Sequence, residues 1–512
     1  MVEELHLGTT AANDTFTTFV ESGAFGKMCY NSFVTAPFWQ TGPNGEVEPF
    51  LVTDWTVSED STTITCDLAL DQGITWHDGE PLTMDDVLFT FDYNINVRKS
   101  SYGSYVDHAE QVDEDTIKVV LKEPGAYQWL KLVAGYFYVQ PKHIWENIDA
   151  PKDYRGEDAV IGCGPYRFVS LDEDAQTSYY EAVSDTYLGR EVTVKKVSLR
   201  SFDSNDALVM ALRNGEIDAM YSYASPIPAT MASSITGVEH VDPGMSDNTG
   251  SYMIMFGFRK GPTDDLNFRK AVTLSLDYEL LAATIGGEDG QVPGEGIISP
   301  AGIGYDDSLP KLVKDQEQAK AILEAAGYID TDGDGWREQP DGTPMDVLVT
   351  PQYNATKAAL YQRIAEIIVT NLGEVGVKCT LDEESIRNSD HEQQLRDDGA
   401  YEIYICYATQ GVSFYKTPFL YMFNDDLSMW GTCDLEDFDQ AYNDMLNAQG
   451  DEDYVAKVKE LQRIASEEVI GIALCWDTAY YPYRTDKYEG WTNFPGWGVI
   501  NCETWYNLHP IG

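Results

Sequence analysis

Hydrophobic and polar residues alternate along this chain with two periods, one typical of strands and one typical of helices. The first strand pattern places apolar residues at every second position: Ile64, Cys66, Leu68 and Leu70. A turn follows at His77-Asp78-Gly79, after which Thr83 and Asp86 have the spacing of a helix capping box. Apolar residues then recur at helical spacing: Val87, Leu88, Phe91 and Ile95. The pattern predicts a strand, a turn and an amphipathic helix.

The second half of the chain repeats this alternation with three helical stripes. The first ends at Gly327 and comprises Ala319, Ile322, Leu323 and Ala326. The second ends at Gly373 and comprises Leu360, Ile364, Ile367, Ile368 and Leu372, before an alternating strand pattern of Val375, Val377, Cys379 and Leu381. The third comprises Val455, Val458, Leu461, Ile464 and Ala465, before an apolar strand from Ile470 to Trp476. Helices that end at glycine and lead into short strands predict α/β architecture with mixed sheets.

Length and composition restrict the possible classes of protein. A chain of 512 residues is too long for one hydrophobic core and predicts about three domains. The 34 Lys and Arg residues against 85 Asp and Glu residues give a net charge of -51, spread along the chain. Because such a surface repels nucleic acid and anionic lipid, we expect neither as a partner and interpret the acidity as a solvated surface.

The composition does not tell whether the protein is cytosolic or exported. The sequence contains no run of about 18 apolar residues, so no membrane-spanning helix is predicted. The segment from Met1 to Leu5 lacks the regions of a signal peptide, as expected of a cytosolic protein or of a mature form. Eight cysteines are far apart and form no CxxC motif, which excludes a zinc ribbon. Several lie in apolar strand patterns, which favours buried thiols over disulfides.

A search for catalytic motifs finds none. There is no GxSxG, HExxH or GxxxxGK[ST] sequence, and the stretch from Gly23 to Lys27 is too short for a phosphate-binding loop. The seven histidines have no metal-ligand spacing. We therefore expect no catalytic residues and no cofactor, and we predict that the protein is not an enzyme.

One acidic loop is a weak candidate for calcium. Its carboxylates follow the spacing of an EF-hand loop: Asp330, Asp332, Asp334, Glu338 and Asp341. The last position carries Asp in place of the usual bidentate Glu, and a strand pattern rather than a helix follows at Met345 to Val349. We interpret the loop as an acidic, glycine-rich turn that needs no ion, with calcium as the alternative.

Longer motifs carry a family resemblance over roughly residues 20 to 500. They are Glu48-Pro49-Phe50-Leu51 with Trp55, Trp76-His77-Asp78-Gly79-Glu80-Pro81-Leu82-Thr83, Pro141-Lys142-His143, Gly162-Cys163-Gly164-Pro165-Tyr166, Gly215-Glu216-Ile217-Asp218, Phe268-Arg269-Lys270-Ala271 with Asp277, and Ala326-Gly327-Tyr328 through Gly335. In type and order they resemble the family 5 extracellular solute-binding proteins, which include oligopeptide-, dipeptide- and nickel-binding components of ABC importers. Cys163 replaces the threonine that is usual at its position.

The resemblance implies an α/β fold of the type II periplasmic-binding-protein kind, a two-lobed clamshell with mixed sheets and an extra small domain. A discontinuous first lobe would comprise 1–38, 163–248 and 479–512, the small domain 39–162, and the second lobe 249–478. The resemblance also implies export, commonly with lipid anchorage, and delivery of a peptide or other small solute to the permease subunits of an ABC importer. We expect a monomer.

The resemblance further implies which segments contact the ligand. Two tyrosines of the small domain are candidates, Tyr102 and Tyr105. The strand and loop of the second lobe add Tyr404, Tyr407, Gln410, Phe414 and Tyr415. Trp476 and Asp477 lie where the chain returns to the first lobe. Aromatic faces and a few fixed polar groups suit a captured solute, and for each residue core packing is the alternative.

One departure from the family bears on the ligand. Peptide binders of the family carry an Asp after the second-lobe strand to pair with the ligand amine, but no acid occurs here between Glu402 and Asp425. Either Asp477 supplies the anion, or the ligand has no free amine, and we favour weak dependence on the amine. No His at 403–425 could bind nickel. A peptide is the first choice, a nickel complex or oligosaccharide the alternative, and a secreted hydrolase the alternative from another class.

Overall fold

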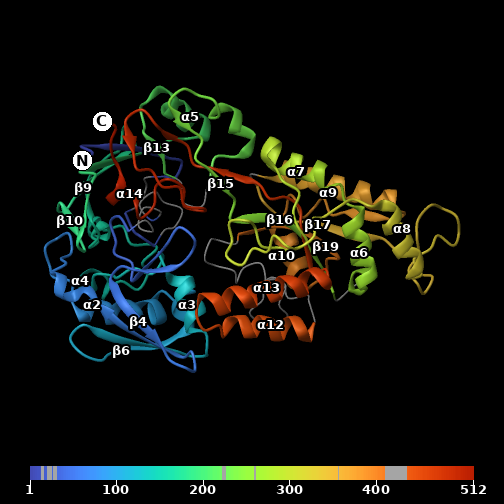
Figure 1. The fold of residues 1–512 in the computed structure, drawn as a ribbon, viewed down its shortest axis with the longest axis horizontal. Helices are drawn as coiled ribbons and strands as arrows, with labels where there is room; N and C mark the ends of the chain where they lie inside the picture. The colour runs from blue at the N-terminus through green and yellow to red at the C-terminus, as the bar shows by residue number, and fades with distance from the viewer. Residues whose placement is uncertain are drawn as a thin grey trace. The chain divides into compact units, whose positions relative to one another are not determined.

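The computed structural model describes residues 1–12, 16–19, 26, 32–221, 226–258, 261–355, 357–409 and 435–512. The chain forms two compact units, each built of sheets and helices (Figure 1). Unit 1 comprises Met1–Ser246, Leu446–Gly450 and Ala479–Gly512, and unit 2 comprises Asp247–Met445 and Asp451–Thr478. The predicted division into two lobes and a small domain stays a prediction.

A mixed sheet of seven strands lies in unit 1. Their order is β14 (Val241–Asp242), β22 (Tyr483–Arg484), β13 (Ala219–Met220), β1 (Leu5–Thr9), β12 (Lys196–Ser201), β9 (Thr177–Ala182) and β8 (Tyr166–Asp172). β1 runs parallel to β12 and β13, whereas β9 runs antiparallel to β12. Helix α5 (Asn205–Asn214) begins after Ser204, whose side chain accepts a hydrogen bond from the Ala207 amide, and ends at left-handed Gly215. These are the local signals that start and end helices.

Residues 39–162 of unit 1 contain a sheet of their own, four antiparallel strands. Its order is β4 (Val52–Val57), β5 (Thr63–Leu68), β7 (Thr116–Leu121) and β6 (Val106–Gln111). The helical elements of this segment are α2 (Met84–Asp92), the π-helical turn η2 (Tyr93–Val97), η3 (Gly103–Tyr105), α3 (Ala126–Val133), α4 (Lys142–Trp145) and η4 (Glu157–Val160). Trp39 and Trp129 of this segment share one hydrophobic core with Leu7 of β1.

Unit 2 is built on a five-stranded sheet. Its order is β18 (Cys379–Leu381), β17 (Val347–Pro351), β19 (Ile403–Thr409), β16 (Gly250–Phe256) and β20 (Gly471–Ala473). The helices are α6 (Leu266–Ser275), α7 (Tyr278–Gly286), α8 (Gln316–Ala325), α9 (Ala358–Glu374), α10 (Ser389–Asp397), α12 (Glu436–Leu446) and α13 (Asp451–Glu467). Ile364 and Ile368 of α9 pack into the same core as Val349 of β17, so the helical stripe read from the sequence faces the sheet.

Short elements complete the two units. Paired strands are β2 (Trp39–Thr41) with β3 (Val47–Pro49), β10 (Thr186–Tyr187) with β11 (Arg190–Glu191), β15 (Met245–Asp247) with β21 (Thr478–Tyr480), and β23 (Tyr488–Glu489) with β24 (His509–Pro510). The remaining helical turns are η1 (Ala69–Gln72), η5 (Ala229–Ser234), η6 (Gly261–Asp264), η7 (Gly287–Asp289) and α14 (Thr504–Asn507).

The capping box predicted at the start of the first helix is present. The Thr83 backbone N–H donates to Asp86 Oδ2 at 2.9 Å, and the Thr83 hydroxyl donates to the same oxygen at 2.8 Å. Helix α2 then begins at Met84 and buries Val87 and Phe91. Ile95 lies beyond α2, in the π-helical turn η2.

Three predicted boundaries are wrong. The first strand ends at Leu68, and Leu70 lies in the 3-10 turn η1, which ends at left-handed Gly73. Helix α9 continues past Gly373, because the reversal occurs at Gly376 with φ of 83°. The strands expected at 375–381 and 470–476 are only three residues each, β18 and β20. Apolar residues outside them are buried without pairing in a ladder.

The six described cysteines are free, as the sequence indicated. Cys66, Cys163, Cys406, Cys475 and Cys502 are buried, and Cys379 is partly buried. Burial raises the pKa of each thiol, because the thiolate loses its hydration. The structure does not describe Cys29 and Cys433.

Two of the family-like motifs are in contact within unit 1. His77 Nε2 lies 3.0 Å from the Gly164 carbonyl oxygen, and the His77 backbone N–H donates to the Gly162 carbonyl at 2.9 Å. Burial lowers the pKa of His77 to about 4, so the ring is neutral at neutral pH. A Cβ at Gly162 would overlap the carbonyl oxygen of Val34, and the glycine is therefore required by close backbone approach.

We predict that Gly162→Ala destabilises the protein, by about 1–3 kcal/mol or more, because the backbone of Val34 must move. The matched control is Gly373→Ala inside helix α9, where the nearest atoms to an added Cβ lie 3.9 Å away. That substitution should stabilise by about 0.5–1 kcal/mol, since alanine is the better helix former. Chemical denaturation of the two variants should therefore give opposite shifts, and equal shifts would contradict the packing argument.

Candidate functional site

Polar and aromatic side chains gather at one end of the unit 2 sheet. β19 runs parallel to β17 and antiparallel to β16, and β16 runs antiparallel to β20. The carboxyl ends of β17, β19 and β20 therefore meet the amino end of β16. Residues that lie there are Asn248, Tyr252, Gln352, Lys357, Tyr407, Trp476 and Asp477, called here the strand-end cluster. The carboxyl ends of strands are where open α/β sheets bind ligands.

Asp477 is the acidic residue of the strand-end cluster. Its Oδ2 accepts a hydrogen bond from Asn248 Nδ2 at 3.0 Å, and its carbonyl oxygen accepts from the Asn248 backbone N–H at 3.1 Å. Among the described residues, no cationic nitrogen lies within 4.0 Å of the carboxylate. Burial raises the pKa of Asp477 to about 6, since the amide offers a dipole but no charge.

Tyr407 and Tyr252 line the strand-end cluster with their rings. They are register partners on β19 and β16, and their ring centroids lie 5.1 Å apart in a T-shaped arrangement. The Tyr407 hydroxyl donates to Asn248 Oδ1 at 3.3 Å. Gln352 fixes this side of the cluster, because its Oε1 accepts from the Tyr407 backbone N–H at 3.0 Å and from the Tyr361 hydroxyl at 2.9 Å.

Lys357 supplies a positive charge to the same cluster. Its ammonium lies 5.0 Å from the ring centre of Tyr407 and 5.4 Å from that of Tyr252, within reach of cation–π attraction. Burial lowers the pKa of Lys357, and the charge of Asp477 opposes this shift. In the described part of the chain no carboxylate approaches the ammonium within 4.0 Å. The cluster thus holds one acid and one base that attract each other without forming an ion pair.

Trp476 is buried beside this acid. It is 5% exposed, and its Nε1 has no hydrogen-bond partner in the described residues. A buried N–H without an acceptor costs free energy.

The residues predicted from the sequence fall into separate places. Asp477, Trp476 and Tyr407 belong to the strand-end cluster of unit 2. Tyr404 points to the opposite face of β19, is fully buried, and donates its hydroxyl hydrogen to Glu392 Oε1 on α10. Tyr102 and Tyr105 are partly buried against the core of unit 1. The last three, Gln410, Phe414 and Tyr415, lie outside the described residues.

The sequence analysis did not find four members of the cluster: Asn248, Tyr252, Gln352 and Lys357. Tyr252 lies in an uninterrupted apolar run, where a core role is the simpler interpretation. The other three are single polar residues next to strands or a helix and belong to no motif. Only the pairing of β16, β17 and β19 brings them together.

The acidic loop lies apart from this cluster in the sequence and is exposed. Oxygens of Asp330, Asp332, Asp334 and Glu338 lie within 4.8 Å of one another, and Asp341 is not among them. The same carboxylates accept backbone hydrogen bonds within the loop, from Gly333 to Asp330 at 2.7 Å and from Asp334 to Asp332 at 3.0 Å. These bonds close an acidic turn, and the absence of a bound ion stays a prediction.

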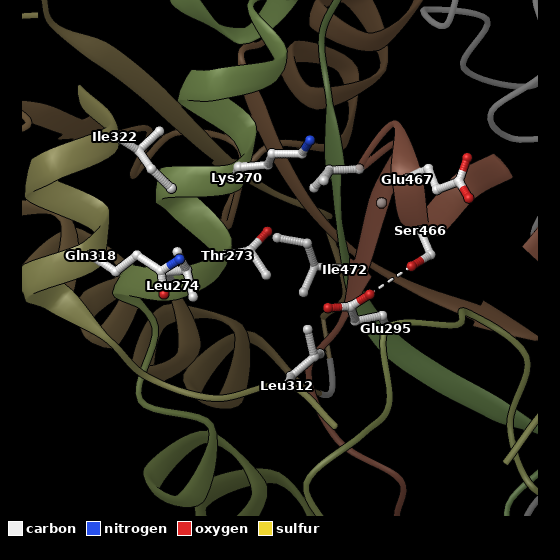
Figure 2. Close-up of a pocket in the computed structure, with 12 residues that line it drawn as sticks. Lys270, Thr273, Leu274, Glu295, Leu312, Gln318, Ile322, Ser466, Glu467 and Ile472 are labelled. Carbon is white, nitrogen blue, oxygen red and sulfur yellow. Dashed lines mark hydrogen bonds between the residues drawn. The ribbon is translucent and has the colours of Figure 1, made fainter. Parts of the chain in front are cut away.

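A separate cavity of about 340 Å³ lies in unit 2 among α6, α8 and the end of α13 (Figure 2). Leu274, Leu312 and Ile472 give it apolar walls, and Ser466 donates to Glu295 Oε2 at 2.7 Å across one side. Its lining includes none of Tyr102, Tyr105, Tyr404, Tyr407, Trp476 and Asp477, the described residues predicted from the sequence to contact the ligand.

The comparisons with known proteins identify the class. Residues 46–429 match the family described as "Bacterial extracellular solute-binding proteins, family 5 Middle". The dipeptide-binding protein of Escherichia coli K12 is 25% identical over 392 residues, which cover 72% of this chain and 68% of that protein. The structure of HbpA2 from Haemophilus parasuis superposes with a TM-score of 0.82 at 18% identity, over 100% of both chains. The oligopeptide-binding protein AppA from Bacillus subtilis, in complex with a nonapeptide, gives a TM-score of 0.70 at 17% identity, over 99% of both chains.

The fold is therefore that of the two-lobed periplasmic binding proteins, and the predicted fold class is confirmed. The chain belongs to family 5 of the bacterial extracellular solute-binding proteins, as the sequence motifs indicated. Within the described residues, no helix is both long and apolar enough to cross a membrane.

We predict that chelation leaves the melting temperature unchanged, because the acidic turn is closed by its own backbone hydrogen bonds. Differential scanning calorimetry with and without EDTA measures this. A bound calcium ion would stabilise the folded state by mass action. A melt that falls with EDTA in the wild type, but not in Asp332→Ala, would show that the turn holds an ion.

Proposed function

We propose that this protein is the solute-binding component of an ABC importer and that it captures a peptide or a similar solute with a free amine. Membership of the solute-binding family supports the first part. The observation that carries the second part is the Asp477 carboxylate, which is partly buried and hydrogen-bonded without an ion-pair partner in the described residues. In this proposal the protein works outside the cytoplasm as a monomer held to the membrane by a lipid anchor. It delivers its solute to the permease subunits of the importer.

The strand-end cluster provides what an ammonium group requires. A partly buried carboxylate with a raised pKa has too little positive charge around it, and a ligand ammonium would stabilise its ionised form. Tyr252 and Tyr407 add ring faces, which attract cations and pack against apolar side chains. This favours the relocated acid over the weak dependence on the amine that the sequence suggested.

Lys357 is the candidate partner for the carboxylate of a short zwitterionic ligand whose amine pairs with Asp477. Its ammonium is partly desolvated and has no carboxylate within 4.0 Å among the described residues. Asp477 and Lys357 would thus attract the opposite charges of an amine and a carboxylate. A solute with both groups satisfies the cluster better than a neutral sugar, and the unpaired Trp476 Nε1 offers a donor for a peptide carbonyl.

The same cluster does not favour catalysis. Its groups are a carboxylate, an ammonium, two phenols and two amides, without a nucleophile next to a base. We infer stoichiometric binding without turnover, as a transport protein requires.

We predict that N-acetylation of a peptide ligand weakens its binding and that Asp477→Asn has the same effect. Binding of an ammonium without its anion is weaker by about 2–5 kcal/mol, roughly 30-fold to several thousandfold in Kd. Isothermal titration calorimetry of a peptide pool and its acetylated counterpart measures this, with mass spectrometry of the released solute to detect turnover. The control is Asp390→Asn on the exposed side of α10.

Three results would contradict the proposal at different levels. If Asp477→Asn binds peptides with unchanged affinity, Asp477 is not the anchor of the amine, whereas the proposed transport function is retained. A preference for acetylated peptides would remove the amine requirement. Hydrolysed ligand would favour the secreted hydrolase.

We predict that affinity for a free-amine peptide falls as the pH is lowered through about 6. Asp477 has a raised pKa, so below that pH it is protonated and no longer attracts the ammonium, whereas the ligand amine stays charged. The loss should approach tenfold per pH unit below 6. Calorimetry from pH 7.5 to 5 should show this slope in the wild type and a flat profile in Asp477→Asn, and a slope shared by both would assign the titration elsewhere.

A further inference from the structure

A second cavity, in unit 1, gathers positive charge in this strongly acidic protein. Its volume is about 380 Å³, and two segments line it, 97–102 and 150–153. Three of the lining residues are cationic, Arg98, Lys99 and Lys152, and only Asp153 is acidic. Cationic residues therefore outnumber acidic ones in the cavity lining, whereas in the whole chain 85 acidic residues outnumber 34 basic ones.

The cations of this cavity are not neutralised by the described protein. Several other basic residues of unit 1 pair with acids, as Lys118 does with Glu110 at 3.5 Å and Arg190 with Glu503 at 2.7 Å. Within the described residues, no carboxylate lies within 4.0 Å of a nitrogen of Arg98, Lys99 or Lys152. In a protein of net charge -51, cations left without partners are a surplus that attracts an anion.

The backbone holds the first of these segments in an unusual conformation. Residues Tyr93–Val97 form a π-helical turn, which the Arg98 backbone N–H closes by donating to the Tyr93 carbonyl at 2.8 Å. Lys99 follows with φ of 48°, in the left-handed region that residues other than glycine rarely adopt. π-Helical turns and such strained residues concentrate at functional sites.

Further contacts fix the same segment from both sides. Ser100 Oγ donates to Asn94 Oδ1 at 3.0 Å and accepts from the Gly103 backbone N–H at 3.0 Å. A Cβ at Gly103 would lie 2.6 Å from the Asn94 carbonyl oxygen, so the loop packs directly on the π-helical turn. The Arg98 guanidinium donates to Asn94 Oδ1 at 2.8 Å and lies 4.2 Å from the ring centre of Phe19. Arg98 and Lys99 are thus carried on a constrained backbone.

We propose that this cavity binds the oxyanion group, phosphate or carboxylate, of a small soluble molecule. Lysine ammonium groups and arginine guanidinium donors both recognise such groups. The exposed Ser101 also lines the cavity. An anionic membrane is a poor source of the oxyanion, because the net charge of -51 repels it. The proposal is independent of whether Asp477 anchors an amine.

The test uses inorganic phosphate and acetate as probes on the full chain, by calorimetry at constant ionic strength against chloride. The test variant is Lys99→Asn with Lys152→Gln, since asparagine tolerates the left-handed conformation. The matched control is Lys118→Gln with Lys195→Gln, which removes the same charge from other exposed positions of unit 1. Circular dichroism verifies that both variants fold.

We expect phosphate or acetate to bind the wild type and the control, and the test variant to bind about tenfold more weakly or not at all. The tighter of the two probes identifies the oxyanion. No binding in the wild type, or equal weakening in both variants, would overturn the proposal. Binding of vesicles with anionic lipid by the wild type but not by the test variant would assign the site to a membrane and overturn the soluble ligand.

Discussion

The hydrogen bond between Asn248 and the Asp477 carboxylate is the interaction on which the candidate site depends. It joins Asn248, which lies between β15 and β16, to Asp477, which lies between β20 and β21, and it orients an acid that has no cation within 4.0 Å among the described residues. Because the amide stabilises the carboxylate only in part, burial raises the pKa of Asp477. Tyr407 hydrogen-bonds the other end of the same amide, which links the acid to the aromatic faces. The candidate site is thus built around a carboxylate that has no ion-pair partner among the described residues.

Both proposed sites follow from how this protein distributes its few cations. Many described basic residues form ion pairs with the abundant acids, and the exposed pairs contribute little to stability. The cations of Lys357 and of the cavity lined by 97–102 and 150–153 are among those that lack a carboxylate within 4.0 Å in the part of the chain that the structure describes. In an acidic protein, such cations mark positions where charge is available to a ligand.

The family-like motifs have structural roles that explain their spacing. His77 of one motif contacts Gly162 and Gly164 of another, and both glycines admit a close backbone approach. In the acidic turn, backbone N–H groups donate hydrogen bonds to the Asp330 carboxylate, and these bonds order the loop. These motifs fix the scaffold, so they identify the family without identifying the solute.

The family, the α/β class and the four helices α2, α8, α9 and α13 could be predicted from the sequence, because these depend on local periodicity, caps and motifs. Thr83 with Asp86 predicted the start of α2 correctly. The family resemblance also selected Asp477 and Tyr407, which lie in the strand-end cluster, and Tyr404, which lies on the opposite face of β19. The alternation of side chains along a strand does not by itself tell which face packs in the core. Asn248, Gln352 and Lys357 required the tertiary structure. They carry no local signal, and only the order of strands β17, β19 and β16 places them around one carboxylate. The cationic cavity likewise depends on two segments about 50 residues apart, whose shared charge no sequence window contains.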